Sequence, residues 1–258
     1  DALAIIDLEK IYTPDTESTA SASARNAFTI KQATDALKAR NINNSYGAAY
    51  APWVQIQDTI SNRLLWAPPS VVALGALSSN DRIAAPWFAP AGFTRGGLSE
   101  GAGGIPVLDV TKRLSSDDRD DLYEANINPI AKFPAEGIVI FGQKTLQVTP
   151  SALDRINVRR LMIFVKKRIS QIAAGILFDP NIQVTWDRFT AQVRPFLQDV
   201  KTNFGLSDFK VVLDSTTTTP DLVDRNILYA QIFLKPTRAI EFIAIDFNIS
   251  RTGASFVD

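Results

Sequence analysis

Residues 151–180 read SALDRINVRRLMIFVKKRISQIAAGILFDP, and this stretch decides the fold class of the sequence. Ser151 followed three residues later by Asp154 is a capping-box pattern, which is typical of a helix start. Apolar residues then recur at spacings of three and four: Val158, Leu161, Val165, Ile169, Ile172 and Ile176. One apolar stripe predicts a helix that packs against a core. We expect it to run to Phe178 and to stop at Asp179-Pro180.

A second apolar stripe follows directly. It comprises Trp186, Phe189, Val193, Leu197, Val200 and Phe204. Pro195 lies inside the stripe and predicts a kink, and Gly205 predicts the end of the helix. Aromatic residues at this spacing usually belong to a core, so we interpret this stripe as a second long, core-facing helix.

Strand patterns come after the two helices. Residues 209–213, 227–234 and 240–249 are apolar and strand-sized, and Lys235-Pro236-Thr237-Arg238 separates the last two. The last run alternates Ile243, Ile245, Phe247 and Ile249 with small or polar residues, which is the period of a half-buried strand. The end of the chain is therefore expected to be rich in β-structure.

The residues before the two helices have an α/β pattern. A strand-sized run at residues 2–8, helical spacing at residues 29–40 and alternation at residues 46–56 fit a βαβ crossover. Pro68-Pro69-Ser70 predicts a short helix that frays at residues 78–80. Ser115 and the acids after it predict a capped helix, since their spacing does not match a calcium-binding EF-hand loop. Residues 127–133 and 137–141 are expected to be strands.

Residues 85–106 are rich in proline, glycine and aromatic residues and form the best internal boundary. Their glycines fit neither the dinucleotide-binding fingerprint nor the phosphate-binding P-loop. We therefore interpret the segment as a structural loop in which Trp87, Phe88 and Phe93 are at least partly buried.

The sequence thus predicts an α+β fold in two parts. Residues 1–104 are expected to be a mixed α/β part that ends in the Pro/Gly-rich loop. Residues 105–258 are expected to be a C-terminal α+β domain with a small sheet, two long helices and an extended arm at about residues 246–258.

The composition removes most familiar enzyme mechanisms. The chain has 258 residues, no cysteine and no histidine. It therefore has no disulfide, thiolate nucleophile or zinc–thiolate site, and no imidazole for acid–base catalysis. Carboxylate chemistry, lysine chemistry and Mg²⁺ or Ca²⁺ bound by oxygen ligands stay open, as does the absence of any chemistry. We found no convincing set of catalytic or metal-ligating residues.

Charge and hydropathy restrict the partners. The 27 basic residues balance the 27 acidic residues, so the formal net charge is zero. General nucleic-acid binders usually carry a basic excess, and we therefore expect no direct nucleic-acid partner. No apolar run approaches the roughly 20 residues of a membrane-spanning helix, so no membrane span is expected.

The first predicted helix carries only basic charges after its cap. At about 100° per residue, one side of the helix and its margin collect five of them: Arg155, Arg159, Arg160, Lys166 and Lys167. This spacing predicts a cationic ridge. The ridge is either a solvated face balanced by acids elsewhere in the chain or a docking surface for an anionic partner.

Several longer motifs occur in order along the chain. Residues 66–70 read WAPPS, 85–92 APWFAPAG, 128–130 NPI, 137–146 GIVIFGQKTL, 152–161 ALDRINVRRL, 178–181 FDPN, 185–186 TW and 235–242 KPTRAIEF. Together they resemble the contractile tail sheath protein of tailed bacteriophages. The resemblance spans nearly the whole chain and is densest from residue 129 to residue 242. Its most specific parts are GQKTL and NVRRL.

The resemblance implies a structural polymer and not an enzyme. Sheath subunits of this family form stacked rings around an inner tail tube, in a stretched state that later contracts and drives the tube through the host cell envelope for genome ejection. The implied partners are other sheath subunits, the inner tail tube protein, and baseplate and tail terminator proteins; no cofactor is implied. The implied location is the virion tail, assembled in the host cytoplasm. Sheath proteins are often longer, so further sequence upstream is expected.

The resemblance also suggests roles for two sites. The cationic ridge is expected to face the inner tube. The C-terminal arm is expected to leave its own subunit and add as a strand to the sheet of a neighbour, through Asp246, Phe247, Asn248, Ile249, Ser250, Arg251, Phe256 and Val257. A frayed tail or an intramolecular edge strand is the alternative for the arm. The alternative for the whole chain is a cytosolic α/β enzyme or nucleotide-binding domain that uses carboxylates and Mg²⁺.

Overall fold

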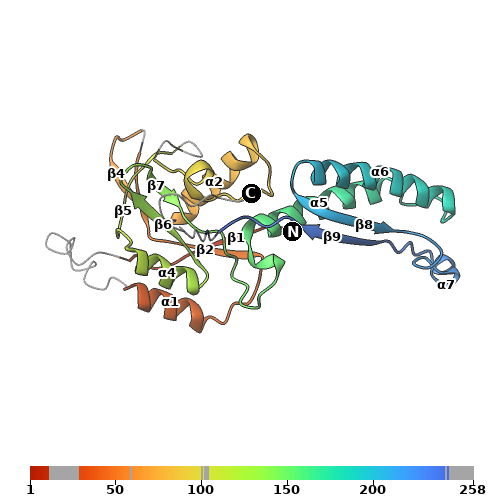
Figure 1. Ribbon diagram of the computed structural model, residues 1–258, viewed down its shortest axis with the longest axis horizontal. Helices are drawn as coiled ribbons and strands as arrows, with labels where there is room; N and C mark the ends of the chain where they lie inside the picture. The colour runs from red at the N-terminus through yellow and green to blue at the C-terminus, as the bar shows by residue number, and fades with distance from the viewer. Residues whose placement is uncertain (12–28, 59, 100, 102–104, 242, 244–258) are drawn as a thin grey trace, which may run out of the picture.

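The computed structural model describes residues 1–11, 29–58, 60–99, 101, 105–241 and 243. In this part of the chain the fold has two bodies, which follow one another end to end along the longest axis (Figure 1). We call the described residues up to Asp154 the sheet body and residues 156–236 the hairpin body. Arg155, residues 237–241 and residue 243 lie at the junction between them.

The sheet body is built on a four-stranded sheet in the order β1-β2-β6-β7. Its strands are β1 (Ala4–Asp7), β2 (Gly47–Ala51), β6 (Ile127–Phe133) and β7 (Gly137–Ile140). The first three pair in parallel and β7 pairs antiparallel to β6. Helix α1 (Ile30–Ala39) joins β1 to β2, which confirms the predicted βαβ crossover. The sheet takes strands from both sides of residue 104, where the sequence predicted a domain boundary.

Helices cover both faces of this sheet. On one face, Ala48 and Tyr50 of β2 pack with the buried side of α2 (Pro69–Ile83). On the other face, Ala49 and Ala51 pack with α1 and α4 (Ser116–Glu124). Because side chains alternate along a strand, β2 feeds both cores, and none of its five residues is exposed.

A second sheet has the order β4-β3-β5, with β3 (Val54–Gln57), β4 (Leu64–Ala67) and β5 (Val107–Val110). The prediction of a single strand at residues 46–56 is therefore wrong, because this stretch forms two strands, β2 and β3. The break falls at Pro52, which has no N–H to donate to a strand ladder. Helix α2 begins after Pro68 as predicted but continues to Ile83, beyond the expected fraying. A short helix, α3 (Gly92–Arg95), lies in the Pro/Gly-rich loop.

The hairpin body contains the two long helices, α5 (Ile156–Ala174) and α6 (Gln183–Thr202). They pack on a two-stranded antiparallel sheet of β8 (Leu206–Val212) and β9 (Gln231–Pro236), and α7 (Pro220–Asp224) lies in the connection. Most of the predicted stripes form one core: Leu161, Val165, Phe189, Val193, Leu197 and Val200. The α+β fold class with two long helices and a small sheet is confirmed.

Three details of the predicted helices are wrong. Ser151 accepts a hydrogen bond from the Leu153 N–H at 3.0 Å and caps a single 3-10 turn (Ala152–Asp154), so it is not the cap of α5. Helix α5 ends at Ala174 and not at Phe178. Phe204 follows the end of α6 and is 73% exposed, so it leaves the stripe and the core. At Ser151 a separate 3-10 turn precedes the helix, and at the ends of α5 and α6 the chain turns before the sequence period would end the helix.

The predicted strands near the chain end shift or fall outside the described structure. Strands β8 and β9 start a few residues from their predicted positions. Ile240, Glu241 and Ile243 are not in a strand, and the rest of the run from 242 to 258 lies outside the described residues. None of the helices in the described ranges is both long and apolar enough to span a bilayer.

Candidate functional site

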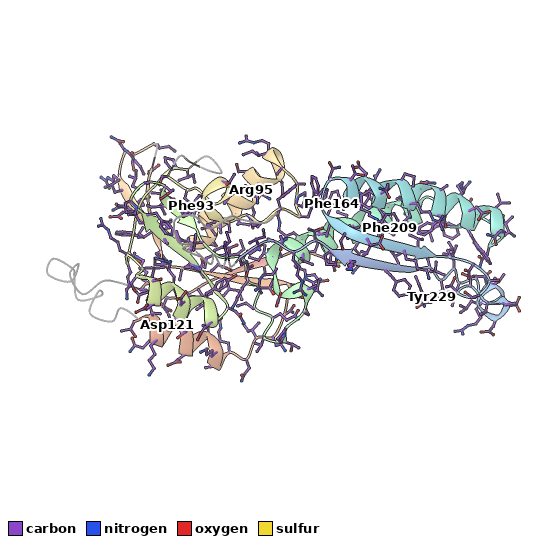
Figure 2. All side chains as sticks on the ribbon, in the orientation of Figure 1. Phe93, Arg95, Asp121, Phe164, Phe209 and Tyr229 are labelled. Carbon is purple, nitrogen blue, oxygen red and sulfur yellow. The ribbon has the colours of Figure 1, made fainter. Side chains whose placement is uncertain are left out.

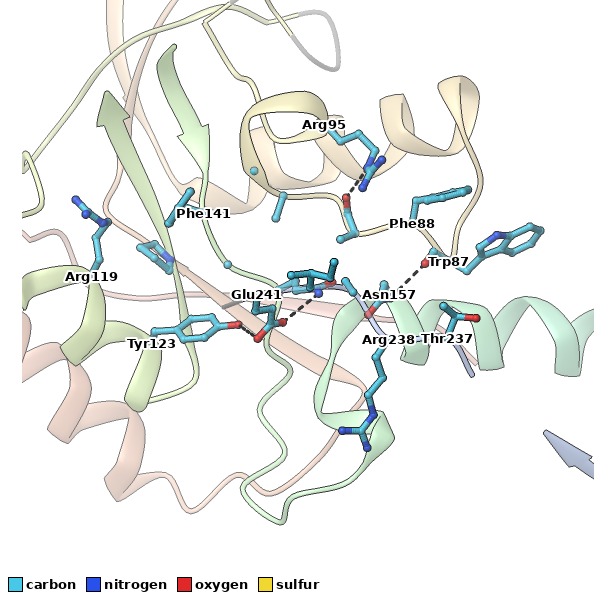
Figure 3. A pocket seen from close by; sticks show the side chains of 18 of the residues that line it. Trp87, Phe88, Arg95, Arg119, Tyr123, Phe141, Asn157, Thr237, Arg238 and Glu241 are labelled. Carbon is cyan, nitrogen blue, oxygen red and sulfur yellow. Dashed lines mark hydrogen bonds between the residues drawn. The ribbon is translucent and has the colours of Figure 1, made fainter. Parts of the chain in front are cut away.

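One carboxylate at the junction between the two bodies, that of Glu241, accepts three hydrogen bonds. Its Oε1 accepts hydrogen bonds from Arg155 Nε at 2.6 Å and from Gln143 Nε2 at 3.1 Å, and its Oε2 accepts one from Tyr123 Oη at 2.9 Å. Figure 3 shows Tyr123 and Glu241 pointing toward one another. We call these four residues the Glu241 clamp. It joins α4, the segment after β7 and the start of α5 to the residues that follow β9.

The segment that supplies Gln143 is itself fixed to the sheet. Buried Asn128 of β6 accepts from the Lys144 N–H at 2.6 Å and donates to the carbonyls of Ala49 and Lys144 at 3.0 and 2.8 Å. The Ile156 N–H donates to the Gln143 carbonyl at 2.7 Å. Backbone groups that do not belong to a sheet are thus satisfied by a side chain and by the start of α5. The clamp therefore stands on rigid elements.

The electrostatics of the clamp favour its charged form. Burial opposes the charge of Arg155, but the hydrogen bond and charge of Glu241 outweigh it, so the pKa of Arg155 is raised. Burial and the charge of Glu241 raise the pKa of Tyr123, so its hydroxyl keeps its proton and donates. Burial and the charge of Arg155 lower the pKa of Lys144. At neutral pH the clamp is an ion pair with two neutral donors.

The predicted cationic ridge does not form one exposed surface. Arg155 is in the clamp, and Arg160 pairs with Asp81 of α2. Arg159 is 7% exposed, lies over the Tyr46 ring at 4.1 Å from its centre and hydrogen-bonds Ser45. The prediction of one exposed ridge is wrong for these arginines. The first turns of α5 pack against the sheet body, so their arginines make contacts within the chain.

Only the later part of the ridge is exposed. Lys166 is 67% exposed and contacts the Asp1 carboxylate, and Lys167 is exposed. The arm residues Asp246, Phe247, Asn248, Ile249, Ser250, Arg251, Phe256 and Val257 lie outside the described residues.

The Pro/Gly-rich loop connects the two bodies. The Trp87 indole N–H donates to the Asn203 carbonyl at 2.7 Å, and the Asn157 amide donates to the Trp87 carbonyl at 3.3 Å. A Cβ on Gly205 would lie 3.1 Å from the Trp87 ring, so glycine permits this close approach. Phe164, labelled in Figure 2, stacks at 5.7 Å from Trp87 and lies on the side of the hairpin body nearest the sheet body.

The burial expected for this loop holds in part. Trp87 and Phe88 are half-buried, as predicted. Phe93 is 52% exposed, yet its ring meets that of Phe133 edge-on at 5.0 Å. Beside the loop is a pocket of about 640 Å³, lined by aromatic residues of the loop and by the segment from Thr237 to Glu241. We call it the junction pocket.

Sequence reasoning missed the clamp. Glu241 stands alone between apolar neighbours in the KPTRAIEF motif, and that isolated charge was the available signal. Tyr123 and Gln143 carry no such signal, because nothing local shows that they face Glu241. Three of the four clamp residues lie in motifs that carried the family resemblance: Gln143 in GQKTL, Arg155 in ALDRINVRRL and Glu241 in KPTRAIEF.

Comparison with known proteins defines the class. Residues 148–250 match the model of the phage tail sheath C-terminal domain family. The tail sheath protein of Vibrio phage KVP40 is 34% identical over 218 residues, which are 84% of this chain and 32% of that protein. The chain belongs to the phage tail sheath proteins. It spans about a third of the length of this curated relative.

Two solved sheath assemblies share the fold. The sheath complex of an extracellular contractile injection system, PVC, in the contracted state has a TM-score of 0.73 and 25% identity, over 86% of this chain and 61% of that chain. The contracted helical sheath of the anti-feeding prophage has a TM-score of 0.68 and 26% identity, over 80% of this chain and 56% of that chain. Both are similar to this chain across the sheet body and the hairpin body together.

Proposed function

We propose that this chain is the part of a tail sheath subunit that polymerises with other copies around an inner tail tube and contracts to drive the tube through the host envelope. The observation that carries the proposal is the similarity to a sheath complex in its contracted state over 86% of the chain. Family membership supports this structural role over the enzyme alternative. Among the described residues, no group of three acidic side chains is placed to hold a metal ion.

The two bodies supply the parts that such a machine needs. Each has its own core, so each can move as a rigid unit while the contacts between copies change. The Glu241 clamp lies a few residues before the proposed arm and fixes the place from which the arm leaves. The arm of one copy then adds as a strand to the β8–β9 sheet of a neighbour. In the described structure that sheet has only two strands, so its outer edges are unpaired.

The surface that meets the inner tube is proposed to be the exposed part of the ridge, Lys166 and Lys167. Each exposed charge pair contributes only about 0–1 kcal/mol and is screened by salt. Many such weak contacts, one set from each subunit, add up to firm binding through multivalency. Each contact is still weak enough to break when the sheath contracts. The remaining proposed partners are baseplate and tail terminator proteins, and the proposed location is the virion tail, assembled in the host cytoplasm. No cofactor takes part, since the energy is stored during assembly.

Negative-stain microscopy of the purified full-length sheath polypeptide tests this function. A sheath subunit forms tubes or rings at high concentration, whereas an enzyme domain stays as single particles. Uniform single particles, with and without the inner tube protein, would reject the proposal.

A further inference from the structure

The turn between α5 and α6 exposes a group of apolar side chains at the far end of the hairpin body. Phe178 is fully exposed, and Leu177, Ile182 and Val184 are 66, 53 and 72% exposed. We call these four residues the hairpin tip. Four apolar side chains at one turn mark a contact surface rather than scattered surface residues.

Phe178 is held in a backbone conformation that suits it poorly. Its φ is +70°, in the left-handed region where glycine or asparagine is favoured and where other residues cost about 1 kcal/mol or more. Nothing within the described chain covers its ring, so burial in this structure does not offset that cost. An exposed aromatic in a strained position is explained by a partner that it contacts.

The junction pocket has the complementary properties. Its walls include the aromatic rings of Trp87, Phe88 and Phe141, and its volume of about 640 Å³ admits a phenylalanine with its neighbours. Gln143 and Asn157 also line it, but their side-chain oxygens are themselves buried and are therefore not available as acceptors for an occupant.

The charge at the rim of the junction pocket also complements the hairpin tip. Arg238 lines the pocket, is exposed and forms no ion pair within the described ranges. Asp179 follows Phe178 directly at the hairpin tip and pairs there with Arg188. A carboxylate has two oxygens, so Asp179 can accept from an arginine at the pocket rim as well.

The hairpin tip cannot fill the pocket of its own copy. Helix α6 begins beside the tip at Gln183 and ends at Thr202, and Phe204 just beyond it lines the pocket. A helix of 20 residues is about 30 Å long. Tip and pocket thus lie at opposite ends of one rigid element.

We propose that the hairpin tip of one copy docks in the junction pocket of a neighbouring copy, with the Phe178 ring against the pocket aromatics. Two complementary surfaces at opposite ends of one molecule make a head-to-tail contact that propagates instead of closing as a dimer. The inference rests on the proposed function, because it names a contact between copies of a sheath subunit.

Disulfide cross-linking tests the contact, because this chain has no cysteine of its own. Any cysteine elsewhere in the full-length polypeptide is first replaced by serine. The full-length polypeptide with both Phe178→Cys and Ala239→Cys, the latter in the pocket wall, is assembled and oxidised. A ladder of covalent multimers on a non-reducing gel is expected. Each single-cysteine variant gives dimers at most. The pair Phe178→Cys with Ala36→Cys, an exposed alanine on α1, is the matched control and gives no ladder.

A second variant measures the contribution of the ring. Phe178→Asn suits the left-handed backbone, so the subunit stays folded, and the concentration needed for assembly is expected to rise at least about tenfold. Val148→Asn removes an apolar side chain that is 67% exposed on the sheet body and leaves that concentration unchanged.

The outcomes separate the inference from the proposed function. Normal assembly without a ladder overturns the tip contact alone. A cross-link from Phe178→Cys to the inner tube protein also overturns it, since the tip then has another occupant. If even the cysteine-free polypeptide fails to assemble, the proposed function and the tip contact fall together.

Discussion

The sheet body and the hairpin body bury their apolar residues in different ways. The sheet body packs helices on both faces of its main sheet, and β2 is buried from end to end. The hairpin body packs two helices on one face of a two-stranded sheet, and its other face keeps Phe233 55% exposed. The sheet body also exposes apolar side chains, such as Leu64 and Leu65 of β4. The comparison teaches that the main sheet of the sheet body is covered on both faces, whereas the sheet of the hairpin body is covered on one face.

The largest expected effect comes from the core of the hairpin body. Leu197→Ala removes a fully buried side chain, and the free energy of unfolding should fall by about 3 kcal/mol. Because this core is separate from those of the sheet body, hydrogen exchange should accelerate in α5, α6, β8 and β9 and stay slow in β2 and β6. Leu122→Ala, equally buried in the sheet body, should reverse that pattern. Equal acceleration throughout both variants would show that the two bodies unfold as one.

The Glu241 clamp sharpens the comparison at its boundary. Glu241→Ala leaves Arg155, whose side chain is 27% exposed, with only the Asp154 carboxylate at 3.2 Å, and it removes the acceptor of Tyr123 and Gln143. It should cost about 2 kcal/mol of unfolding free energy. Asp221→Ala breaks an exposed pair with Arg225 in the hairpin body and is the matched control, with no measurable cost. Denaturant unfolding measures both. A similar loss in the two variants would argue against a special role for the clamp.

A smaller effect concerns pH and the sheet body. Burial opposes ionisation of Asp118, but hydrogen bonds from Ser115 and the nearby Lys112 outweigh it and lower the pKa of this carboxyl. Because the pKa of Asp118 is lower in the folded chain, ionised Asp118 stabilises the fold. This stabilisation is complete above the unfolded-state pKa near 3.8 and is lost as the pH falls through the folded-state pKa. The loss of stability below about pH 4 should therefore be shallower in Asp118→Asn than in the parent, as thermal unfolding at several pH values would record. An unchanged slope would mean that Asp118 contributes nothing to acid unfolding.

The smallest effect on stability is expected at the exposed end of the ridge. Lys166→Glu with Lys167→Glu should change the unfolding free energy by less than about 0.5 kcal/mol, because both side chains lie at the surface. Assembly around the inner tube should nevertheless weaken at low salt, which co-sedimentation with tube protein measures. Arg168→Glu, one residue further along the same helix, tests whether any charge reversal on α5 has this effect. Normal assembly of the double variant would remove the ridge from the tube interface.

Local patterns were enough for most elements. The βαβ crossover, the cap at Ser115 and the two long helices follow from apolar periods and from capping chemistry, which act over a few residues. Phe204 was misplaced because the period of a stripe does not show where a tertiary contact ends the helix. Ser151 was misplaced because a capping pattern does not show whether a 3-10 turn or the α-helix follows it. Helix α6 stops at Thr202, where Gly205 lets the chain approach Trp87.

The candidate site was harder to predict, because it depends on contacts between distant segments. Spacing placed five basic residues on one side of α5, but it could not show that Arg159 lies under the sheet body and beside Tyr46. Nor could it bring Glu241 to Tyr123, which is 118 residues away in the chain. Family resemblance marked the right segments without giving their roles.

The hydrogen bond between the Trp87 indole and the Asn203 carbonyl has a mechanical consequence. It anchors one end of α6 to the sheet body, whereas the hydrogen bond near the other end, from Asn181 to the Ile227 carbonyl, stays within the hairpin body. The hairpin body therefore acts as a lever with its fulcrum at the junction. Over an arm of about 30 Å, a rotation of about 10° at the fulcrum moves the far end by about 5 Å, close to one helical turn. A slight change of angle between the two bodies is thereby amplified into a shift as large as the spacing between successive contacts on a helix.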